Sequence, residues 1–491
     1  MRKIVSLLAL LLCVGAAAQT PLQRFVDQVA DDDVLRGALL GVVVRDGDGT
    51  VLASRGADRK LVPASNLKLI TTGAALHQLG PEYRFRTGIG YTGTIEDGTL
   101  YGDVYIVGGG DPTLGMQDSL ALRTDALFWR WKSQLKGAGI QRIDGRIIGD
   151  GRAFEGHLEN VSWSYDDAGT YYGTGCNALS FYANAIDYSV AAAAREGDPV
   201  RIVQTFPETP WMHFQNYAVT GPAGTGNSLY LFTTDLAPYS ELRGTFATDR
   251  KPKTEHFANK YGSLTCAYYF WKNLVSTGWT VTGGYADIDR SGAIRQGPDF
   301  VPAGPAGKPA LIGFTESAPL RSIARATNVR SDNFFAETLF RTLGEERSAW
   351  AVYDSCQVAV NAVLEALGLH PENGLRMMDG SGLSRSNYLS PNMMADFLTA
   401  MEESPAFDAF LASLPAPGEG TLALVLRRAA PETAARFRLK SGSMDGVLCY
   451  SGYILVPGGK PLVVSLMVNN CTAKTAAVRA VLERILLLAA G

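Results

Sequence analysis

Three short motifs contain the residue types that activate a serine without a histidine. In chain order they are Ser65-Asn66-Leu67-Lys68, Ser331-Asp332-Asn333 and Lys440-Ser441-Gly442. Residues three apart on a helix share a face, so the Lys68 amine can reach the Ser65 hydroxyl and serve as its general base. That amine must be neutral to accept a proton, and burial together with a second cation nearby, such as Lys440, lowers a lysine pKa.

The other motif residues supply the remaining parts of an acyl transfer. Ser331 is predicted to relay the proton to the leaving amine, and Asn333 to hold the Lys68 side chain or the substrate amide. Lys440, on an edge strand, is predicted to supply positive charge for a substrate carboxylate.

The third motif also predicts how the developing anion is held. Ser441 adds a hydroxyl to the carboxylate site, and Gly442 lets a second backbone pass close by. The backbone N–H groups of Ser65 and Ser443 are predicted to form an oxyanion hole, a device typically worth about 3 kcal/mol of barrier.

Each motif alone also has a purely structural interpretation. An S-x-x-K match arises by chance roughly once in a chain of this length, with Ser65 as a helix cap and Lys68 as a solvated side chain. The second motif can be a helix cap and the third a strand entering a turn. The three together favour catalysis, because each falls on the kind of element that the mechanism requires.

Periodicity predicts the elements that carry these motifs. Two strands, 39–44 and 50–54, flank an Asp/Gly turn, and a helix follows Pro63 and ends at Gly80-Pro81. From about Tyr83 to Pro305 the pattern predicts mainly β structure in an insertion. Helices are expected at 320–326, 334–343, 349–367 and 422–428. The end of the chain predicts strands at 436–440, 447–455 and 461–468 and a helix at 473–488.

Pairing the first hairpin with the last places both chain ends in one sheet, with the middle as a separate part. The predicted division is an export signal at 1–18, a discontinuous catalytic domain at 19–85 and 306–491, and an inserted region at 86–305, composed of two lobes.

These motifs resemble the set found in β-lactamases and penicillin-binding proteins. The chain is similar to low-molecular-mass penicillin-binding proteins of the D-Ala-D-Ala carboxypeptidase and endopeptidase type, in the class C subgroup with a long insertion. Ser65 and Ser331 lie 266 residues apart. Three stretches share the resemblance: Pro63-Ala64-Ser65-Asn66-Leu67-Lys68, Gly108-Gly109-Gly110-Asp111-Pro112-Thr113-Leu114 and Asp379-Gly380-Ser381-Gly382-Leu383-Ser384.

The resemblance implies an α/β (α+β) fold, a transpeptidase/β-lactamase-like domain with an antiparallel sheet flanked by helices, plus inserted, mainly β lobes. It implies a serine-type hydrolase of peptidoglycan stem peptides that forms an acyl-enzyme on Ser65, is trapped by β-lactams and needs no cofactor. One departure is Ser441, where the family usually has threonine. Because the hydroxyl remains, activity is expected to persist.

The resemblance also suggests residues that recognise the third amino acid of the stem peptide. Asp167, with Asp166 as the alternative, corresponds to an aspartate that meets a free amino group, and Arg385 and Met444 fall where related enzymes grip that side chain. The structural alternatives are a surface ion pair for Asp167 or Arg385 and core packing for Met444.

Composition restricts the setting. Residues 1–18 run from Arg2 and Lys3 through an apolar stretch to small residues, which predicts a secretory signal and an exported, periplasmic protein. The formal charge of −3, or −5 without Arg2 and Lys3, and the lack of a basic tract argue against nucleic acid as a partner. No later segment reaches the length of a membrane span.

Five cysteines follow the signal, an odd number at irregular spacing, so at least one thiol should be free or buried. The five histidines lie far apart, which gives no support for a metal site.

Two other functions remain compatible with the motifs. A β-lactamase or esterase uses the same serine chemistry, although the long insertion argues against it. A non-catalytic peptidoglycan-binding scaffold would keep the fold without reacting, although three intact motifs argue against it. Carboxypeptidase and endopeptidase activity are both left open, as is the identity of the third stem-peptide residue.

Overall fold

The structure is a computed structural model that describes residues 19–288, 292–296, 301–347 and 351–491. The predicted export signal, 1–18, lies outside the described residues. In the described part, no helix combines the length and the apolar character needed to cross a membrane.

A five-stranded antiparallel sheet joins the two ends of the chain, in the order β2-β1-β25-β24-β23. Its strands are β1 (Leu39–Arg45), β2 (Val51–Arg55), β23 (Phe437–Met444), β24 (Val447–Ile454) and β25 (Leu462–Asn469). The predicted pairing of the first hairpin with the last is therefore confirmed. The third motif lies on β23, whose outer edge is unpaired within this sheet.

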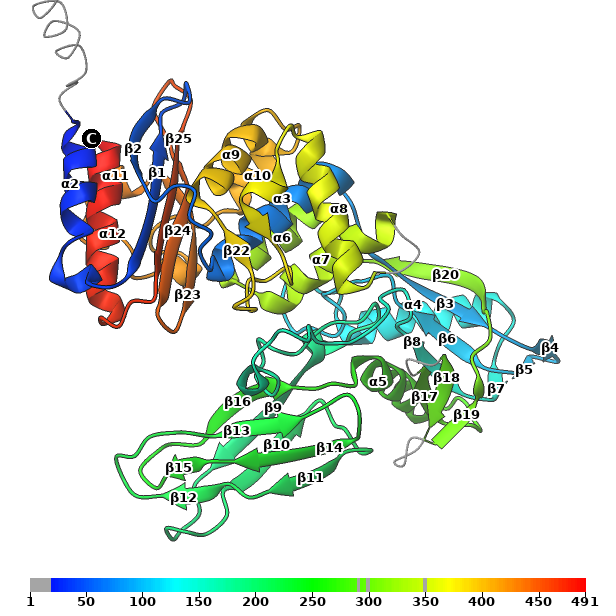
Figure 1. Cartoon of the computed structure of the whole chain (residues 1–491). Helices are drawn as coiled ribbons and strands as arrows, with labels where there is room; N and C mark the ends of the chain where they lie inside the picture. The colour runs from blue at the N-terminus through cyan, green and yellow to red at the C-terminus, as the bar shows by residue number, and fades with distance from the viewer. Residues whose placement is uncertain (1–18, 289–291, 297–300, 348–350) are drawn as a thin grey trace, which may run out of the picture.

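Helices cover both faces of this sheet (Figure 1). One face packs against α2 (Pro21–Val29) and α12 (Thr475–Ala490), which share an apolar cluster with the strands. The other face packs against a larger group of helices. These are α3 (Lys68–Leu79), α6 (Leu320–Arg330), α7 (Asn333–Arg347), α8 (Tyr353–Ala366), α9 (Pro391–Glu402) and α10 (Phe407–Ser413).

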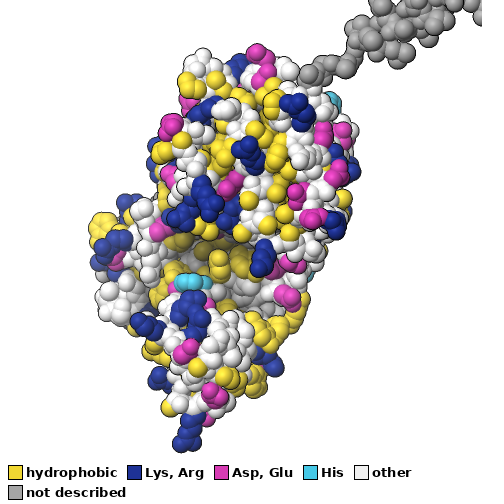
Figure 2. Space-filling view, turned by 90° about the vertical axis from the view of Figure 1, so that its left-hand side faces the viewer, with side chains coloured by type: hydrophobic (Ala, Val, Ile, Leu, Met, Phe, Trp, Pro, Cys, Tyr) yellow, Lys and Arg dark blue, Asp and Glu magenta, His cyan; other side chains and the backbone are white. Residues whose placement is uncertain are grey.

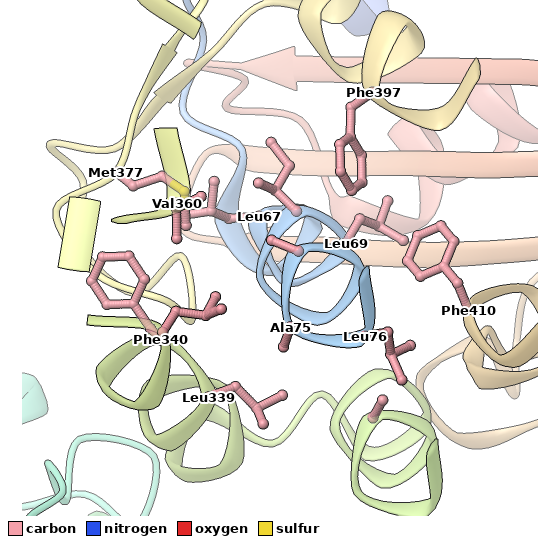
Figure 3. Packing of buried hydrophobic residues seen from close by; sticks show 14 of the residues in the cluster. Leu67, Leu69, Ala75, Leu76, Leu339, Phe340, Val360, Met377, Phe397 and Phe410 are labelled. Carbon is pink, nitrogen blue, oxygen red and sulfur yellow. The ribbon is translucent and has the colours of Figure 1, made fainter. Parts of the chain in front are cut away.

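Helix α3 lies in the centre of this group and is buried on all sides. Residues 68–76 are all buried, and Leu69, Ala75 and Leu76 point toward different neighbours in Figure 3. Most of these residues are apolar, and the buried hydroxyls of Thr71 and Thr72 donate to the carbonyls of Gly380 and Lys68. Packing in the core thus fixes helix α3, which begins with Lys68, the last residue of the first motif.

The middle of the chain forms two further parts. The first is a seven-stranded sheet, β19-β18-β17-β8-β6-β3-β20, with α4 (Thr124–Gly137) and α5 (Gly262–Ser276). Its strands are β3 (Arg86–Tyr91), β6 (Val104–Val107), β8 (Ile147–Asp150), β17 (Tyr285–Ile288), β18 (Ala293–Gln296), β19 (Val301–Pro305) and β20 (Ala310–Glu316). A small sheet accompanies it, formed by β4 (Thr94–Glu96), β5 (Thr99–Tyr101) and β7 (Arg142–Asp144).

The second part is entirely β and lies at the bottom of Figure 1. Its three sheets contain β9 (Ala185–Ala191), β10 (Arg201–Phe206) and β16 (Lys253–Ala258), then β11 (His213–Asn216), β13 (Tyr230–Thr233) and β14 (Tyr239–Arg243), and finally β12 (Val219–Gly221) and β15 (Thr245–Ala247). It has its own apolar cluster, which includes Val190, Leu242 and Phe246.

Short elements complete the chain. They are the 3₁₀ turns η1 (Asp33–Leu35), η2 (Ala64–Leu67), η3 (Tyr165–Asp167), η4 (Tyr182–Asn184), η5 (Pro371–Asn373) and η6 (Gly420–Leu422), the strands β21 (Leu375–Arg376) and β22 (Tyr388–Leu389), and the helix α11 (Pro431–Ala434).

The predicted fold class is confirmed, and two local expectations are corrected. The helix expected at 422–428 is instead η6 followed by turns, because Leu426 has a φ of 54° and a left-handed residue cannot continue a right-handed helix. The mainly β insertion contains the long helices α4 and α5, and its sheet continues to β20, beyond residue 305, through pairing with β3.

Candidate active site

The first motif stands where a 3₁₀ turn leads into the buried helix α3. Ser65 lies in η2 and is partly exposed, whereas Lys68 opens α3 and is fully buried. The Lys68 Nζ lies 3.0 Å from Ser65 Oγ, within hydrogen-bonding distance, and donates to Asn333 Oδ1 at 2.6 Å and to the Ser381 carbonyl at 2.7 Å. Asn66 ties the turn to the sheet by donating to Ser451 Oγ at 2.8 Å.

The partners of Lys68 suit an amine that acts as a base. A neutral amine has two N–H groups and one lone pair. Asn333 Oδ1 and the Ser381 carbonyl are both acceptors and can take the two N–H groups, which leaves the lone pair for the Ser65 hydroxyl. Asn333 therefore holds Lys68, one of the two roles expected from the sequence.

Burial lowers the pKa of Lys68 to about 8, although the carboxylates of Asp379, Glu337 and Asp332 act in the opposite direction. Glu337 raises the pKa of Lys68 less than a fully ionised carboxylate would. The reason is that burial and the charge of Asp379 raise the pKa of Glu337 itself to about 8. A substantial fraction of neutral Lys68 is therefore available near neutral pH.

The second motif lies at the junction of α6 and α7. Ser331 takes a left-handed conformation, with a φ of 58°, and ends α6, while Asn333 begins α7. Between them, Asp332 Oδ1 accepts the Phe335 N–H at 3.0 Å. The motif therefore includes a helix cap, and its two other side chains face the lysines of the first and third motifs.

The third motif brings Lys440 to this junction. Its fully buried Nζ donates to Ser331 Oγ at 2.9 Å and to the Ser441 carbonyl at 2.7 Å. Burial and the charge of Lys68 lower the pKa of Lys440 well below its ordinary value. Lys440 therefore contacts the Ser331 hydroxyl directly, and Lys68 acts on Lys440 through its charge.

Gly442 allows strand β23 to approach the turn that carries Ser65. A Cβ at Gly442 would lie 2.5 Å from the Pro63 carbonyl oxygen and 2.8 Å from the Asn66 nitrogen, both backbone atoms. The expected close passage of two backbones is confirmed. It places the strand beside the Ser65 N–H, as an oxyanion hole between Ser65 and Ser443 requires.

A pocket of about 440 Å³ opens beside the nucleophile. Ser65, Ser331, Ser441 and Ser443 share its wall, and Ser441 Oγ donates to Thr421 Oγ1 at 2.9 Å. The space-filling view shows a hollow between the upper part of the molecule and the lower lobe (Figure 2).

Two of the three residues expected to hold the third stem-peptide residue, Arg385 and Met444, lie near the end of β23, and Asp167 lies in η3. Arg385 Nη2 donates at 3.1 Å to the carbonyl of Asp445, the residue after Met444. Burial raises the pKa of Asp167, while a hydrogen bond with Tyr172 and the charge of Arg385 oppose that rise. Met444 is partly buried and packs against the main apolar cluster. The role of these three residues in binding the stem peptide stays a prediction.

Several residues of the site were not predicted. Tyr172, in the insertion, accepts the Asn333 Nδ2–H through its carbonyl at 3.0 Å. Glu337 Oε1 accepts the Ser381 N–H at 2.8 Å and so fixes the carbonyl that Lys68 uses. Glu337 lies four residues after Asn333 on the same helix, a spacing that could have revealed it.

Among the described residues, no group of three or more His, Cys, Asp and Glu side chains is arranged to hold a metal ion. The five described cysteines are all free, and four of them are buried, as expected for at least one.

Fold and geometry together define an active-site-serine hydrolase with a lysine base. The model of the D-Ala-D-Ala carboxypeptidase 3 (S13) family matches residues 22–490, so the chain belongs to that family. It is a serine-type D-Ala-D-Ala carboxypeptidase and a low-molecular-mass penicillin-binding protein.

Known relatives cover most of the chain. The D-alanyl-D-alanine carboxypeptidase of Actinomadura sp. (strain R39) is 31% identical over 475 residues, covering 93% of this chain and 82% of the relative. DacB of Haemophilus influenzae is 23% identical, with coverage of 88% and 86%. The crystal structure of penicillin binding protein 4 from Haemophilus influenzae shares the fold, with a TM-score of 0.78, 21% identity and coverage of 95% and 98%.

The lowered pKa of Lys68 predicts the pH dependence of acylation. With a pKa of about 8, roughly a tenth of the amine is neutral at pH 7, against roughly 0.03% for an ordinary lysine. The second-order rate constant for acylation by a fluorescent penicillin should rise about tenfold from pH 7 to pH 9 and level off above. Lys68→Arg, which stays charged, should lose at least about a hundredfold. A profile that is flat from pH 6 to pH 9 would contradict a lysine base.

Proposed function

We propose that the chain hydrolyses peptidoglycan stem peptides through an acyl-enzyme on Ser65. Lys68 Nζ contacts Ser65 Oγ, and its other two partners are hydrogen-bond acceptors. This position of Lys68 supports the proposal most directly. In the first step Ser65 Oγ attacks the carbonyl of the penultimate D-alanine, and the hydroxyl proton moves to Lys68 Nζ. The N–H groups of Ser65 and Ser443 stabilise the resulting oxyanion.

In the second step the tetrahedral intermediate collapses and the peptide C–N bond breaks. The leaving nitrogen takes its proton from the Ser331 hydroxyl, which Lys440 contacts at 2.9 Å. The proton that Lys68 took from Ser65 restores that hydroxyl, so Lys68 is neutral again before deacylation. Water then attacks the ester on Ser65, and the shortened peptide and the free serine are released. A β-lactam opens on the same hydroxyl and remains attached. The intact site argues against a non-catalytic scaffold.

We also propose a periplasmic location, where cell-wall peptides are accessible, and the export signal predicted at 1–18 supports it. Its apolar stretch after Arg2 and Lys3 has the form that secretion machinery removes. The enzyme would then act on cell wall from the outside of the inner membrane.

Mass spectrometry of protein purified from the periplasm after expression of the full chain tests both points. The mature mass should correspond to a chain that begins at Gln19, and benzylpenicillin should add one penicilloyl group, located on the peptide that contains Ser65. Ser65→Ala should gain none. An adduct that persists in Ser65→Ala would remove the proposed mechanism.

Endopeptidase activity on cross-linked peptides is a second candidate, favoured by a pocket of about 360 Å³ that also has Ser331 in its wall. Tyr171, Tyr172 and Tyr182 line it, beside an ion pair between Arg330 and Asp118 at 2.5 Å. This pocket offers space next to the residue that protonates the leaving amine, as a leaving group larger than D-alanine requires.

Purified cross-linked sacculi separate the two activities. Incubation should convert cross-linked muropeptide dimers to monomers and also release free D-alanine, both of which chromatography of the digested products resolves. Ser65→Ala should leave the dimers and the terminal alanine in place. Alanine release with unchanged dimers would restrict the enzyme to carboxypeptidase activity.

A carboxylate at Asp167 within electrostatic reach of the Arg385 guanidinium supports a third stem-peptide residue whose side chain carries both an ammonium and a carboxylate, as diaminopimelate does. The carboxylate of Asp167 would take the ammonium and the guanidinium of Arg385 the carboxylate. Met444 would contact the methylene groups between them.

Asp167→Asn tests this assignment. For a peptide with diaminopimelate at the third position, kcat/KM should fall roughly tenfold, the effect of about 1.4 kcal/mol. A peptide with norleucine at that position should be cleaved at an unchanged rate. Asp166→Asn, at the exposed neighbouring position, tests the alternative assignment and should leave cleavage of both peptides unchanged. Equal losses on both peptides would contradict recognition of the ammonium group by Asp167.

A further inference from the structure

The pocket beside Ser65 has one wall that none of the three motifs supplies. Thr475 and Arg479, both on the final helix α12, line it together with Ser65, Ser331 and Ser441. Among the described residues that line this pocket, Arg479 is the cationic side chain. The end of the chain therefore contributes positive charge close to the nucleophile.

Lys440 is poorly placed to be the cation that holds a substrate carboxylate. Its side chain is fully buried, is absent from the pocket wall and is occupied by Ser331 Oγ and the Ser441 carbonyl. Its ammonium form is also disfavoured by burial and by the charge of Lys68, which lower its pKa. A carboxylate in the pocket therefore needs a second, permanent positive charge.

Arg479 lies near the hydroxyl groups that a carboxylate would meet. Its guanidinium hydrogen-bonds with Tyr450, and Tyr450 is the direct cross-strand partner of Ser441. Paired residues on adjacent strands have Cβ atoms about 5 Å apart, with their side chains on the same face. Ser441 Oγ in turn contacts Thr421 Oγ1 at 2.9 Å.

The nearest acidic side chain on the same helix is engaged elsewhere. Glu483, one turn after Arg479, accepts the Leu426 N–H through Oε1 at 2.9 Å. Arginine remains charged at any physiological pH and presents several N–H donors in one plane, an arrangement that matches a carboxylate. The pocket wall thus places the hydroxyl groups of Ser441 and Thr421 in the same pocket as the guanidinium of Arg479.

We propose that Arg479, together with Thr421, binds the carboxylate of the leaving amino acid and makes the enzyme select peptides with a free C-terminal carboxylate. This inference rests on the proposed function and adds a specificity-determining residue to it. In a cross-linked substrate the leaving amine belongs to the acceptor peptide. Where the carbon that bears this nitrogen also bears a carboxylate, the same contact would hold that carboxylate.

The test compares two peptides that differ only at the C-terminus: diacetyl-lysyl-D-alanyl-D-alanine and its C-terminal carboxamide. Wild-type full-length enzyme should prefer the acid in kcat/KM. Arg479→Gln should reduce the ratio of acid to amide at least tenfold by slowing the acid and leaving the amide unchanged, and Arg479→Lys should keep part of the preference. Arg484→Gln, at an exposed position on the same helix, should retain the wild-type ratio.

Acylation of Ser65 by benzylpenicillin methyl ester, which lacks the carboxylate, serves as a second readout and should be unaffected by Arg479→Gln. An unchanged acid-to-amide ratio in both Arg479 variants, or equal losses on both peptides, would overturn the role of Arg479 while the proposed function stands. A wild-type enzyme that cleaves neither peptide would contradict the proposed function and this inference with it.

Discussion

The site depends on an amine that is buried without a carboxylate in direct contact. Lys68 Nζ has a hydroxyl, an amide oxygen and a backbone carbonyl as its partners. A carboxylate at hydrogen-bonding distance would keep the lysine charged, whereas neutral acceptors satisfy its N–H groups and leave its lone pair available. The carboxyl groups of Glu337 and Asp379 are buried nearby, and their charges raise the pKa of Lys68 without direct contact. Because the pKa of Glu337 is itself raised, its contribution is smaller.

The neutral acceptors around Lys68 come from distant parts of the chain. The central helix α3 fixes Lys68, the junction of α6 and α7 supplies Asn333, and the loop after β21 supplies the Ser381 carbonyl. The insertion takes part as well, because Tyr172 holds the amide of Asn333 through its carbonyl. On the opposite side, the close approach of Gly442 to Pro63 sets the distance between the strand and the nucleophile. The inserted region is therefore part of the active site's support.

Sequence reasoning found the parts of this arrangement that depend on local spacing. The Ser65–Lys68 contact follows from helix geometry, and the alternating strands at both ends of the chain predicted the shared sheet. Sequence reasoning missed the residues whose position depends on tertiary contacts. The Ser381 carbonyl is a backbone atom that any residue could provide, and Arg479 becomes part of the pocket only because α12 packs beside Tyr450. Leu426 has an ordinary helix-forming side chain, and its left-handed backbone is visible only in the fold. Helices α4 and α5 escaped notice among the many turns of the insertion.

The most direct test of a neutral base is titration of Lys68 itself by NMR, with lysine labelled with ¹³C at Cε and the resonance assigned by its loss in Lys68→Arg. We expect a midpoint near pH 8, in line with the pKa of about 8 that burial produces for Lys68. A midpoint near the ordinary lysine value of 10.5 would show that the amine is charged at neutral pH and would contradict its role as the base.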